Sequence, residues 1–408
     1  MSESGEMTMG QRIEYYRKRK GMTRQGLGVR VQRGENWVYK VEKDLLQVDK
    51  YSLLLDLVSV LGVESIQSLT GQHLLLASEP AAQHASLEGL RAVMNELPGT
   101  CGDRLDSAVP SVAALTGQVE QAWAVYDHAT DRYADLGPKL PELLGQAHRT
   151  LRGASGPEQL LAVTALVRVY NLVQVYAKRL GQSELARLAA DRAVALAADS
   201  GDTVLMAAAA WNLGAIMLNR GEGDYALDVA RTMIGLMTPV PEDASHEYLS
   251  LYGALHLVAV IACARSGRAA DGYGYLEDAS RAAQRLGADR NDWGTSFGAA
   301  NVAMHACHLS GEQGNSADVL RLAADVELPE IIPLERRTRY LAEIMGAHRL
   351  QREDVATLYV IKEIVRISPE EAKYFSSLRA ALRDLLTRER AHFKSDLREL
   401  AAHVGVLA

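Results

Sequence analysis

The stretch KRLGQSELA, residues 178–186, links two alanine- and leucine-rich segments through a glycine, and similar stretches recur along the chain. The counterparts are NRGEGDYA (219–226), ARSGRAADG (264–272) and HLSGEQGNSA (308–317), with HRLQRED (348–354) as a fifth. The expected turn positions are Gly181, Gly221, Gly267, Gly311 and Gln351. Each unit has the pattern of a helix, a short turn and a second helix. Because one hairpin cannot bury its apolar face alone, the repeats predict a stack of hairpins.

The rest of the chain has the same helical character. Alanine and leucine recur at helical spacing, and the alternation typical of strands is rare. Small residues such as Ala186, Ala190 and Ala193 allow neighbouring helices to approach closely. We therefore predict an all-α fold in which residues 111–408 form an α-solenoid, with a plain helical bundle as the alternative. Helices near 369–386 and 391–404 would cap the stack.

Composition is that of a soluble globular protein: 408 residues, 48% hydrophobic and 23% charged. The three cysteines are widely spaced and odd in number, so a disulfide framework is not expected. The first residues, MSESGEMTMG, do not resemble a signal peptide, and no run of 18 apolar residues predicts a membrane span. We expect a cytoplasmic protein with no membrane partner.

Charge is distributed unevenly. Ten lysines and arginines but only three acids lie between Arg12 and Lys43, whereas the whole chain has a net charge of −7. A basic end on an acidic chain indicates either a polyanion-binding region or a solvated charge run.

The basic end also has the pattern of about five short helices. Expected helices run from Gly10 to Arg19, from a cap at Thr23 to Arg30, over 35–43, over 51–61 and over 64–69. Apolar spacing packs the second and third helices across a tight turn, with Gly28 at their closest approach. This arrangement is a helix-turn-helix, whose second helix would lie in the major groove of DNA.

The stretches GQRIEYYRKRKGMTRQGLGVRV, NWVYKVEKD and LLDLVSVLGV resemble the lambda-repressor-like (XRE) helix-turn-helix family. The whole chain resembles bacterial regulators of that family that carry a tetratricopeptide-like sensor, although the usual repeat is shorter, about 34 residues. The resemblance implies a DNA-binding domain at 1–71, a connection at 72–110 and a ligand-binding, dimerising repeat domain at 111–408. It also implies a structural ion pair between Arg17 and Glu42. Gln32 and Gly34 depart from the family's turn glycine and its Ser/Thr cap.

The third helix, in RGENWVYKVEKD (33–44), would carry the base contacts. Asn36 suits adenine, Lys40 suits guanine and Glu35 suits cytosine, while Tyr39 would contact a thymine methyl or a phosphate. The expected phosphate contacts are Thr23, Arg24, Arg33 and Lys43. The alternative is a helix-turn-helix that no longer reads DNA and contacts only protein.

A second set of candidates lies in the repeats. Asn171, Asn212, His256 and Asn301 fall near equivalent positions of the first helices and would form a polar ladder along a groove. Amides there suit a peptide backbone, but local hydrogen bonds between helices are the alternative.

Residues 289–308 suggest a pocket. Trp293, Phe297, Asn301 and His305 are spaced to share one helical face, which is typical either of a ligand pocket or of a core contact. His305, Cys307 and His308 do not have the spacing of a metal site. Cys263 and Cys307 could form a thiol switch or simply pack in the core.

Enzyme motifs such as GxSxG or a phosphate-binding glycine loop are missing from the sequence. We therefore expect no enzyme, no cofactor and no metal. The expected protein is a transcriptional regulator that binds operator DNA as a homodimer and senses a peptide or small molecule. The alternative is an interaction scaffold.

Overall fold

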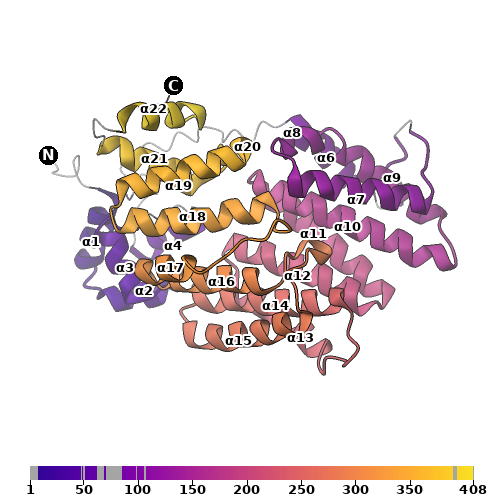
Figure 1. Ribbon diagram of the computed structural model, residues 1–408, viewed down its shortest axis with the longest axis horizontal. Helices are drawn as coiled ribbons and strands as arrows, with labels where there is room; N and C mark the ends of the chain where they lie inside the picture. The colour runs from indigo at the N-terminus through magenta and orange to yellow at the C-terminus, as the bar shows by residue number, and fades with distance from the viewer. Residues whose placement is uncertain are drawn as a thin grey trace.

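The computed structural model describes residues 8–46, 48, 51–61, 69, 85–97, 99–104, 107–388 and 393–407. These residues form an all-α protein, and the only β-pairing among them is an isolated bridge between Arg290 and Phe297. A small N-terminal head lies beside the orange helices α16 to α18, which are far from it in sequence (Figure 1). The expected helix over 64–69 falls almost wholly outside the described residues, and residues 72–84 of the expected connection fall wholly outside them.

The head contains four described helices. They are α1 (Met9–Arg19), α2 (Arg24–Arg30), α3 (Glu35–Glu42) and α4 (Tyr51–Leu61). The first three agree with the predicted ranges to within about one residue. Their shared core is built from buried aliphatic side chains, including Ile13, Leu27, Val38, Val41 and Leu57.

The turn between α2 and α3 has the geometry that the sequence implied. A Cβ atom added to Gly28 would lie 2.5 Å from the carbonyl oxygen of Arg33, so a larger residue would force the two helices apart. Gln32 has a φ of 54°, a left-handed conformation that glycine adopts more readily. Gly34 precedes α3 without a side-chain cap. The absence of the family's turn glycine and helix cap therefore destabilises this turn locally, but the helix-turn-helix still forms.

The predicted ion pair between Arg17 and Glu42 is confirmed. Both side chains are buried, and Arg17 Nη2 donates to Glu42 Oε2 at 3.1 Å while Arg17 Nε donates to Oε1. Arg24 Nε donates to the same carboxylate at 2.7 Å. Two guanidinium groups thus fix α1 and α2 to the end of α3.

The repeat region consists of helical hairpins, preceded by α6 (Ala85–Met94), α7 (Val112–His128), α8 (Arg132–Leu136) and α9 (Leu140–Gly153). The hairpins are α10/α11 (Pro157–Arg179, Ser183–Ser200), α12/α13 (Thr203–Arg220, Gly223–Leu236), α14/α15 (His246–Arg265, Ala269–Leu286), α16/α17 (Ala299–Glu312, Ser316–Ala323) and α18/α19 (Leu334–Leu350, Asp354–Ile367). Alanines at the helix contacts, such as Ala186 and Ala190, are fully buried, as close helix packing requires.

Three of the predicted turn glycines have the expected left-handed conformation: Gly181, Gly221 and Gly267. The last two turns fall within the predicted stretches, but their left-handed residues were predicted wrongly. Gly311 lies inside α16, and the left-handed residue of that turn is Gly314, with a φ of 74°. In the fifth turn the left-handed residue is Arg352, not Gln351. The shift of the fourth turn follows from α16, which begins late, after Gly298, and continues to Glu312.

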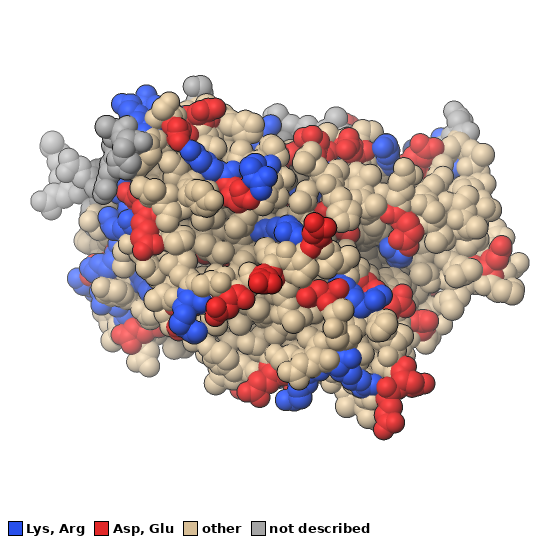
Figure 2. Space-filling view, in the orientation of Figure 1, with Lys and Arg blue, Asp and Glu red and all other residues tan. Residues whose placement is uncertain are grey.

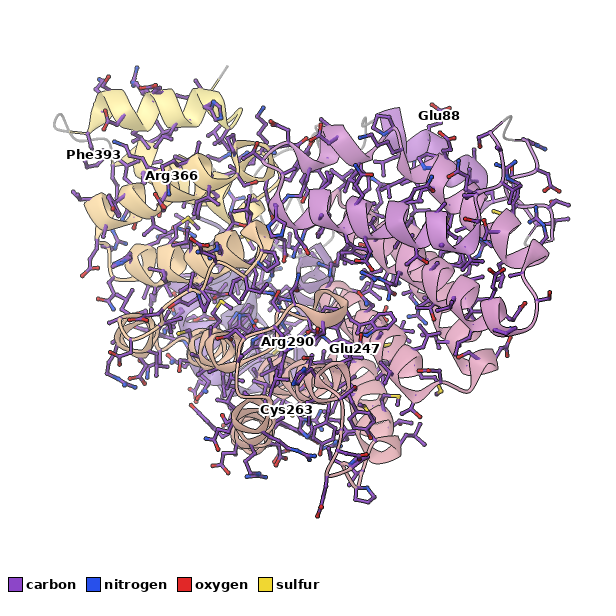
Figure 3. All side chains as sticks on the ribbon, turned by 45° about the vertical axis from the view of Figure 1, so that its right-hand side comes forward. Glu88, Glu247, Cys263, Arg290, Arg366 and Phe393 are labelled. Atoms are coloured by element: carbon purple, nitrogen blue, oxygen red, sulfur yellow. The ribbon has the colours of Figure 1, made fainter. Side chains whose placement is uncertain are left out.

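The predicted helical face shared by Trp293, Phe297, Asn301 and His305 does not form, because α16 begins only at Ala299. Residues Asp292–Gly294 form a short 3-10 turn, η3, in which Trp293 has a φ of 55°. Asn291 holds this turn in place, since its Nδ2 donates to Asp127 Oδ2 of α7 at 2.8 Å. Arg290 lies beside Glu247 at the same place (Figure 3) and binds Asp292 at 2.7 Å. A polar clamp to α7 therefore replaces the first turns of the expected helix.

The last helices close the solenoid onto its beginning. They are α20 (Pro369–Ala372), α21 (Ser376–Thr387) and α22 (Lys394–His403), and α20 lies next to α8 (Figure 1). Arg132 of α8 is fully buried and donates to Glu371 of α20 at 2.5 Å. The Glu370 carboxylate accepts the backbone N–H groups of Tyr133 and Ala134 at 2.9 and 3.1 Å. The expected C-terminal cap is thus also a clasp between the two ends of the repeat domain.

Two described helices, α10 and α14, are long and apolar enough to cross a membrane by length and composition. Most of each is buried within the protein, as in the core helices of a solenoid.

Candidate nucleic-acid interface and sensor contacts

Helix α3 presents three faces. Val38, Val41 and Glu42 face the head core and are buried. Glu35, Asn36, Tyr39 and Lys43 are exposed on the open side. Arg33, just before the helix, lies with Trp37 and Lys40 along a third side, which faces the repeat domain.

The open face holds four of the predicted DNA contacts, Glu35, Asn36, Tyr39 and Lys43. Tyr39 is 42% exposed, and the Arg24 guanidinium lies 5.1 Å from the centre of its ring. Lys43 Nζ donates to Glu14 at 2.9 Å, an exposed ion pair worth little to stability. Lys18 and Lys43 hold the pKa of Glu14 down at about 2, so this carboxylate is charged at neutral pH.

The start of α2 is arranged differently from the prediction of phosphate contacts. The Thr23 hydroxyl caps the helix by accepting the N–H of Gly26 at 3.0 Å. Arg24 is half-buried and directed at Glu42. Both side chains therefore have structural partners in this structure, and their contact with phosphate stays a prediction.

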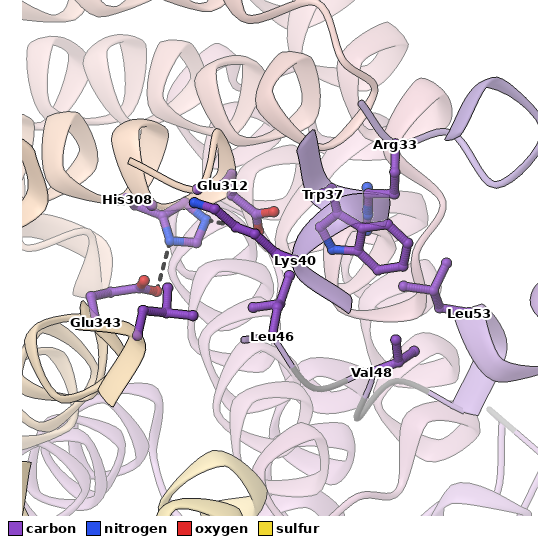
Figure 4. A pocket seen from close by; sticks show the side chains of 12 residues that line it. Arg33, Trp37, Lys40, Leu46, Val48, Leu53, His308, Glu312 and Glu343 are labelled. Carbon is purple, nitrogen blue, oxygen red and sulfur yellow. Dashed lines mark hydrogen bonds and ion pairs between the residues drawn. The ribbon is translucent and has the colours of Figure 1, made fainter. Parts of the chain in front are cut away.

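The third face of α3 is docked on the repeat domain (Figure 4). Arg33 Nη1 donates to the backbone carbonyl of Arg265 at the end of α14. Burial lowers the pKa of Arg33, and the nearby Glu312 carboxylate opposes that shift. Arg33 and Lys40, two predicted DNA contacts, are thus turned toward the repeat domain instead of the open side.

A cavity of about 260 Å³ lies at this contact. Its head wall is Arg33, Trp37, Lys40, Leu46, Val48 and Leu53, and its repeat-domain wall is His308, Gly311, Glu312, Gly314, Glu343 and Leu350. His308 Nδ1 lies 2.8 Å from Glu343 and its Nε2 lies 3.5 Å from Glu312. Burial lowers the pKa of Lys40, whose ammonium group lies next to Gly314. Opposite charges therefore face each other across the contact.

The four residues of the predicted polar ladder lie in α10, α12, α14 and α16, the first helices of successive hairpins. All four are buried. Asn212 Nδ2 donates to the Ala208 carbonyl at 3.0 Å, and His256 Nδ1 lies 2.8 Å from the Tyr252 carbonyl. Asn301 Nδ2 donates to the Thr295 carbonyl at 3.0 Å. These bonds are local, but they run to the same helix or to the turn before it, rather than between helices, which the alternative predicted. Ligand contact by the ladder stays a prediction.

Asn171 differs from the other ladder residues. Its Oδ1 is buried without a hydrogen-bond partner among the described residues, and so are both polar atoms of Gln174, one turn further along α10. Lys178 follows one more turn along the same side of the helix. The inner side of α10 is therefore polar along several turns.

The predicted aromatic stripe does not form one helical face. Phe297 precedes α16, is fully buried and packs on the backbone of α14, where a Cβ atom added to Gly253 would lie 1.8 Å from its ring. Trp293 lies in η3 with the Arg168 guanidinium 5.7 Å from its ring. His305 remains on α16, where burial lowers its pKa to about 3. Phe297 thus fits the core-contact alternative.

The three cysteines lie in the protein core. Cys101, Cys263 and Cys307 are buried free thiols, and burial raises the pKa of each. Protonated, enclosed thiols are poor nucleophiles, so the structure favours packing over a switch. Across the described part of the chain, no three His, Cys, Asp or Glu side chains are grouped as a metal site would require.

A cluster of cations on α10 and α18 was missed by the sequence analysis. Its members are Lys178 and Arg179 at the end of α10 and Arg336 and Arg339 in the first turns of α18. An ion pair between Arg179 and Glu335 brings the two helix ends together. Basic side chains lie in the hollow at the centre of the molecule's face (Figure 2). In the sequence, ERRTRY (335–340) looks like an ordinary solvated helix, which is why its placement could not be foreseen.

Comparisons with known proteins add little. No protein-family model matches the chain, and no curated protein matches it. Among solved structures, it is similar to PlcR of Bacillus thuringiensis, in complex with the peptide PapR7 and DNA, at 10% sequence identity and a TM-score of 0.36. The match covers 85% of this chain and 98% of that one. The function proposed below rests on the chain's own residues.

Proposed function

We propose that the protein is a DNA-binding transcriptional regulator whose repeat domain senses a peptide or small molecule. The observation that carries the proposal is the open row Glu35, Asn36, Tyr39 and Lys43 on the second helix of a well-packed helix-turn-helix. These side chains offer the donors, acceptors and charge that base edges and phosphates require. One small head reads few bases, so operator binding is proposed to need a homodimer with half-sites about 34 Å apart.

The contact between α3 and the repeat domain supports a mechanism by which a ligand controls DNA binding. Arg33 and Lys40 contact the repeat domain, so the docked head offers an incomplete set of DNA contacts. A ligand that binds the repeat domain differently in the docked and undocked states would shift the population of heads free to bind operator.

The test begins with selection of genomic DNA fragments by the full-length protein, followed by fluorescence anisotropy on the recovered site across a salt series. We expect an inverted repeat, bound on the order of a thousandfold more tightly than random DNA. Asn36→Ala should cost about 1–3 kcal/mol on that site and relax the base preference there. Asn95→Ala, an exposed amide outside the head, is the matched control. Equal losses of affinity for specific and random DNA would show that Asn36 does not contact a base.

The second candidate function is an interaction module whose helix-turn-helix has lost DNA binding. The left-handed Gln32 and the engagement of Arg33 and Lys40 with the repeat domain favour it. It predicts no sequence-selective DNA binding by the wild-type protein or by a variant with an undocked head.

A further inference from the structure

The end of α10 and the start of α18 concentrate positive charge. Among the described residues, the side chains of Lys178, Arg336 and Arg339 make no ion pair or hydrogen bond. The acids nearby have other partners: Glu335 binds Arg179, and Glu343 binds His308. Asp127 lies near Arg336 and Glu343 lies near Arg339, but neither acid forms an ion pair with them among the described residues, so the three cations outnumber the acids that face them.

The cations lie close together, and one side of the cluster is open to solvent. The Nε atoms of Arg179 and Arg336 are buried without a hydrogen-bond partner in the described chain, whereas the Arg339 side chain reaches solvent. Burial and Arg179 lower the pKa of Arg336 to about 10. Arg179 lowers the pKa of Arg339 to about 9, and burial lowers that of Lys178 strongly. The protein therefore holds several cations close together at an electrostatic cost, which is common at functional sites.

The geometry points to a binding site for a small phosphate-bearing anion between α10 and α18, held by Lys178, Arg336 and Arg339. Guanidinium groups match phosphate oxygens as paired donors, and lysine adds a compact charge. Because the cations already repel one another, a polyanion would relieve repulsion as well as form hydrogen bonds. Asn171 and Gln174, which are buried with unpaired polar atoms on the same side of α10, continue this polar side of the helix into the interior.

Contacts connect this site to the docked head. Glu343 lies one turn after Arg339 on α18 and binds His308. His308 and Arg265 both contact Glu312, and the Arg265 carbonyl accepts from Arg33 beside α3. An effect of the anion on head docking rests on the proposed function, whereas the binding itself does not.

The test is isothermal titration calorimetry of the full-length protein at low salt, with pyrophosphate, inorganic phosphate and citrate as probes. We expect saturable binding of pyrophosphate, one per chain, with inorganic phosphate and citrate weaker. Arg339→Gln should weaken it roughly ten- to a hundredfold, as the loss of a charged hydrogen-bond donor does. Since Arg339 is exposed, its replacement should leave the melting temperature nearly unchanged.

Two further variants test whether pyrophosphate binding depends on these particular cations. Arg281→Gln removes one charge from an exposed position on α15 and should bind pyrophosphate like the wild type. Arg336→Lys keeps the charge but loses the paired donors, so its affinity should fall between those of the wild type and Arg339→Gln. Absence of saturation, or equal affinities of the wild type and Arg339→Gln, would overturn the site. Citrate binding as tightly as pyrophosphate would overturn its assignment to phosphate. Because these measurements contain no DNA, failure of operator binding would leave them unaffected.

Discussion

Trp37 provides a direct test of whether the repeat domain holds the head. It lines the contact cavity and also packs against the head core, but it is not one of the expected DNA contacts. Trp37→Ala should therefore loosen docking without removing a side chain from the reading face. A tryptophan buries about 150–250 Å². If about 100 Å² of this faces the repeat domain, the contact contributes about 2.5 kcal/mol at about 25 cal/mol per Å².

A loss of that size changes the docking equilibrium by roughly 70-fold. Apparent operator affinity scales with the fraction of heads that are free to bind, so a largely docked wild type should gain roughly tenfold or more in affinity. Leu350→Ala, on the repeat-domain wall of the same cavity, should act in the same direction without altering the head.

The assay combines anisotropy on the selected operator with distance measurements between labels at two exposed positions, Arg19 in the head and Asp271 in α15. Val29→Ala is the control, because Val29 is 71% exposed on α2 and does not line the contact. The reasoning is refuted if both cavity variants keep a folded head but leave the label distances and the operator affinity at wild-type values.

Two more predictions concern the repeat domain. Asp127 is half-buried beside η3, and partial burial raises its pKa from 3.8 to about 6. The folded state therefore binds this proton more tightly than the unfolded state, and stability should fall as pH rises from about 4 to 6. Asp127→Asn should remove that loss, a gain of up to about 3 kcal/mol at pH 7 in chemical unfolding, and an unchanged pH profile would contradict it. Glu371→Gln should leave Arg132 buried without its counter-ion and cost roughly 3–5 kcal/mol, read as a lower melting temperature. A melting temperature equal to that of the wild type would show that the clasp between α8 and α20 contributes little.

Local sequence patterns predicted the head well. The ranges of α1 to α3, the brace between Arg17 and Glu42 and the close approach at Gly28 all agree with the structure. Each depends on residues within one small core, where spacing along a helix fixes which side chains face inward. The all-α class and the first three repeat turns were predictable for the same reason, since glycine after a helix marks its end.

The predictions failed where a distant part of the chain decides the conformation. The spacing of Trp293 and Phe297 fits a helix, but Asn291 bonds to Asp127, more than 160 positions away in the chain, and a short turn forms instead. The fourth turn moved from Gly311 to Gly314 because α16 begins only after Gly298 and continues to Glu312.

The sequence by itself determined the elements of this protein: short helices in the head, long hairpins after it, and polar side chains on the outside of α3. Only the tertiary structure decided which of those side chains are free. Arg33 and Lys40 look like Asn36 and Lys43 in the sequence, yet docking on α14 and α16 separates them from the open face. Likewise, three cations of α10 and α18 meet only because the ion pair between Arg179 and Glu335 joins helix ends that are more than 150 residues apart. Helical periodicity is set by near neighbours, whereas the partner of each helical face is set by how the whole chain packs.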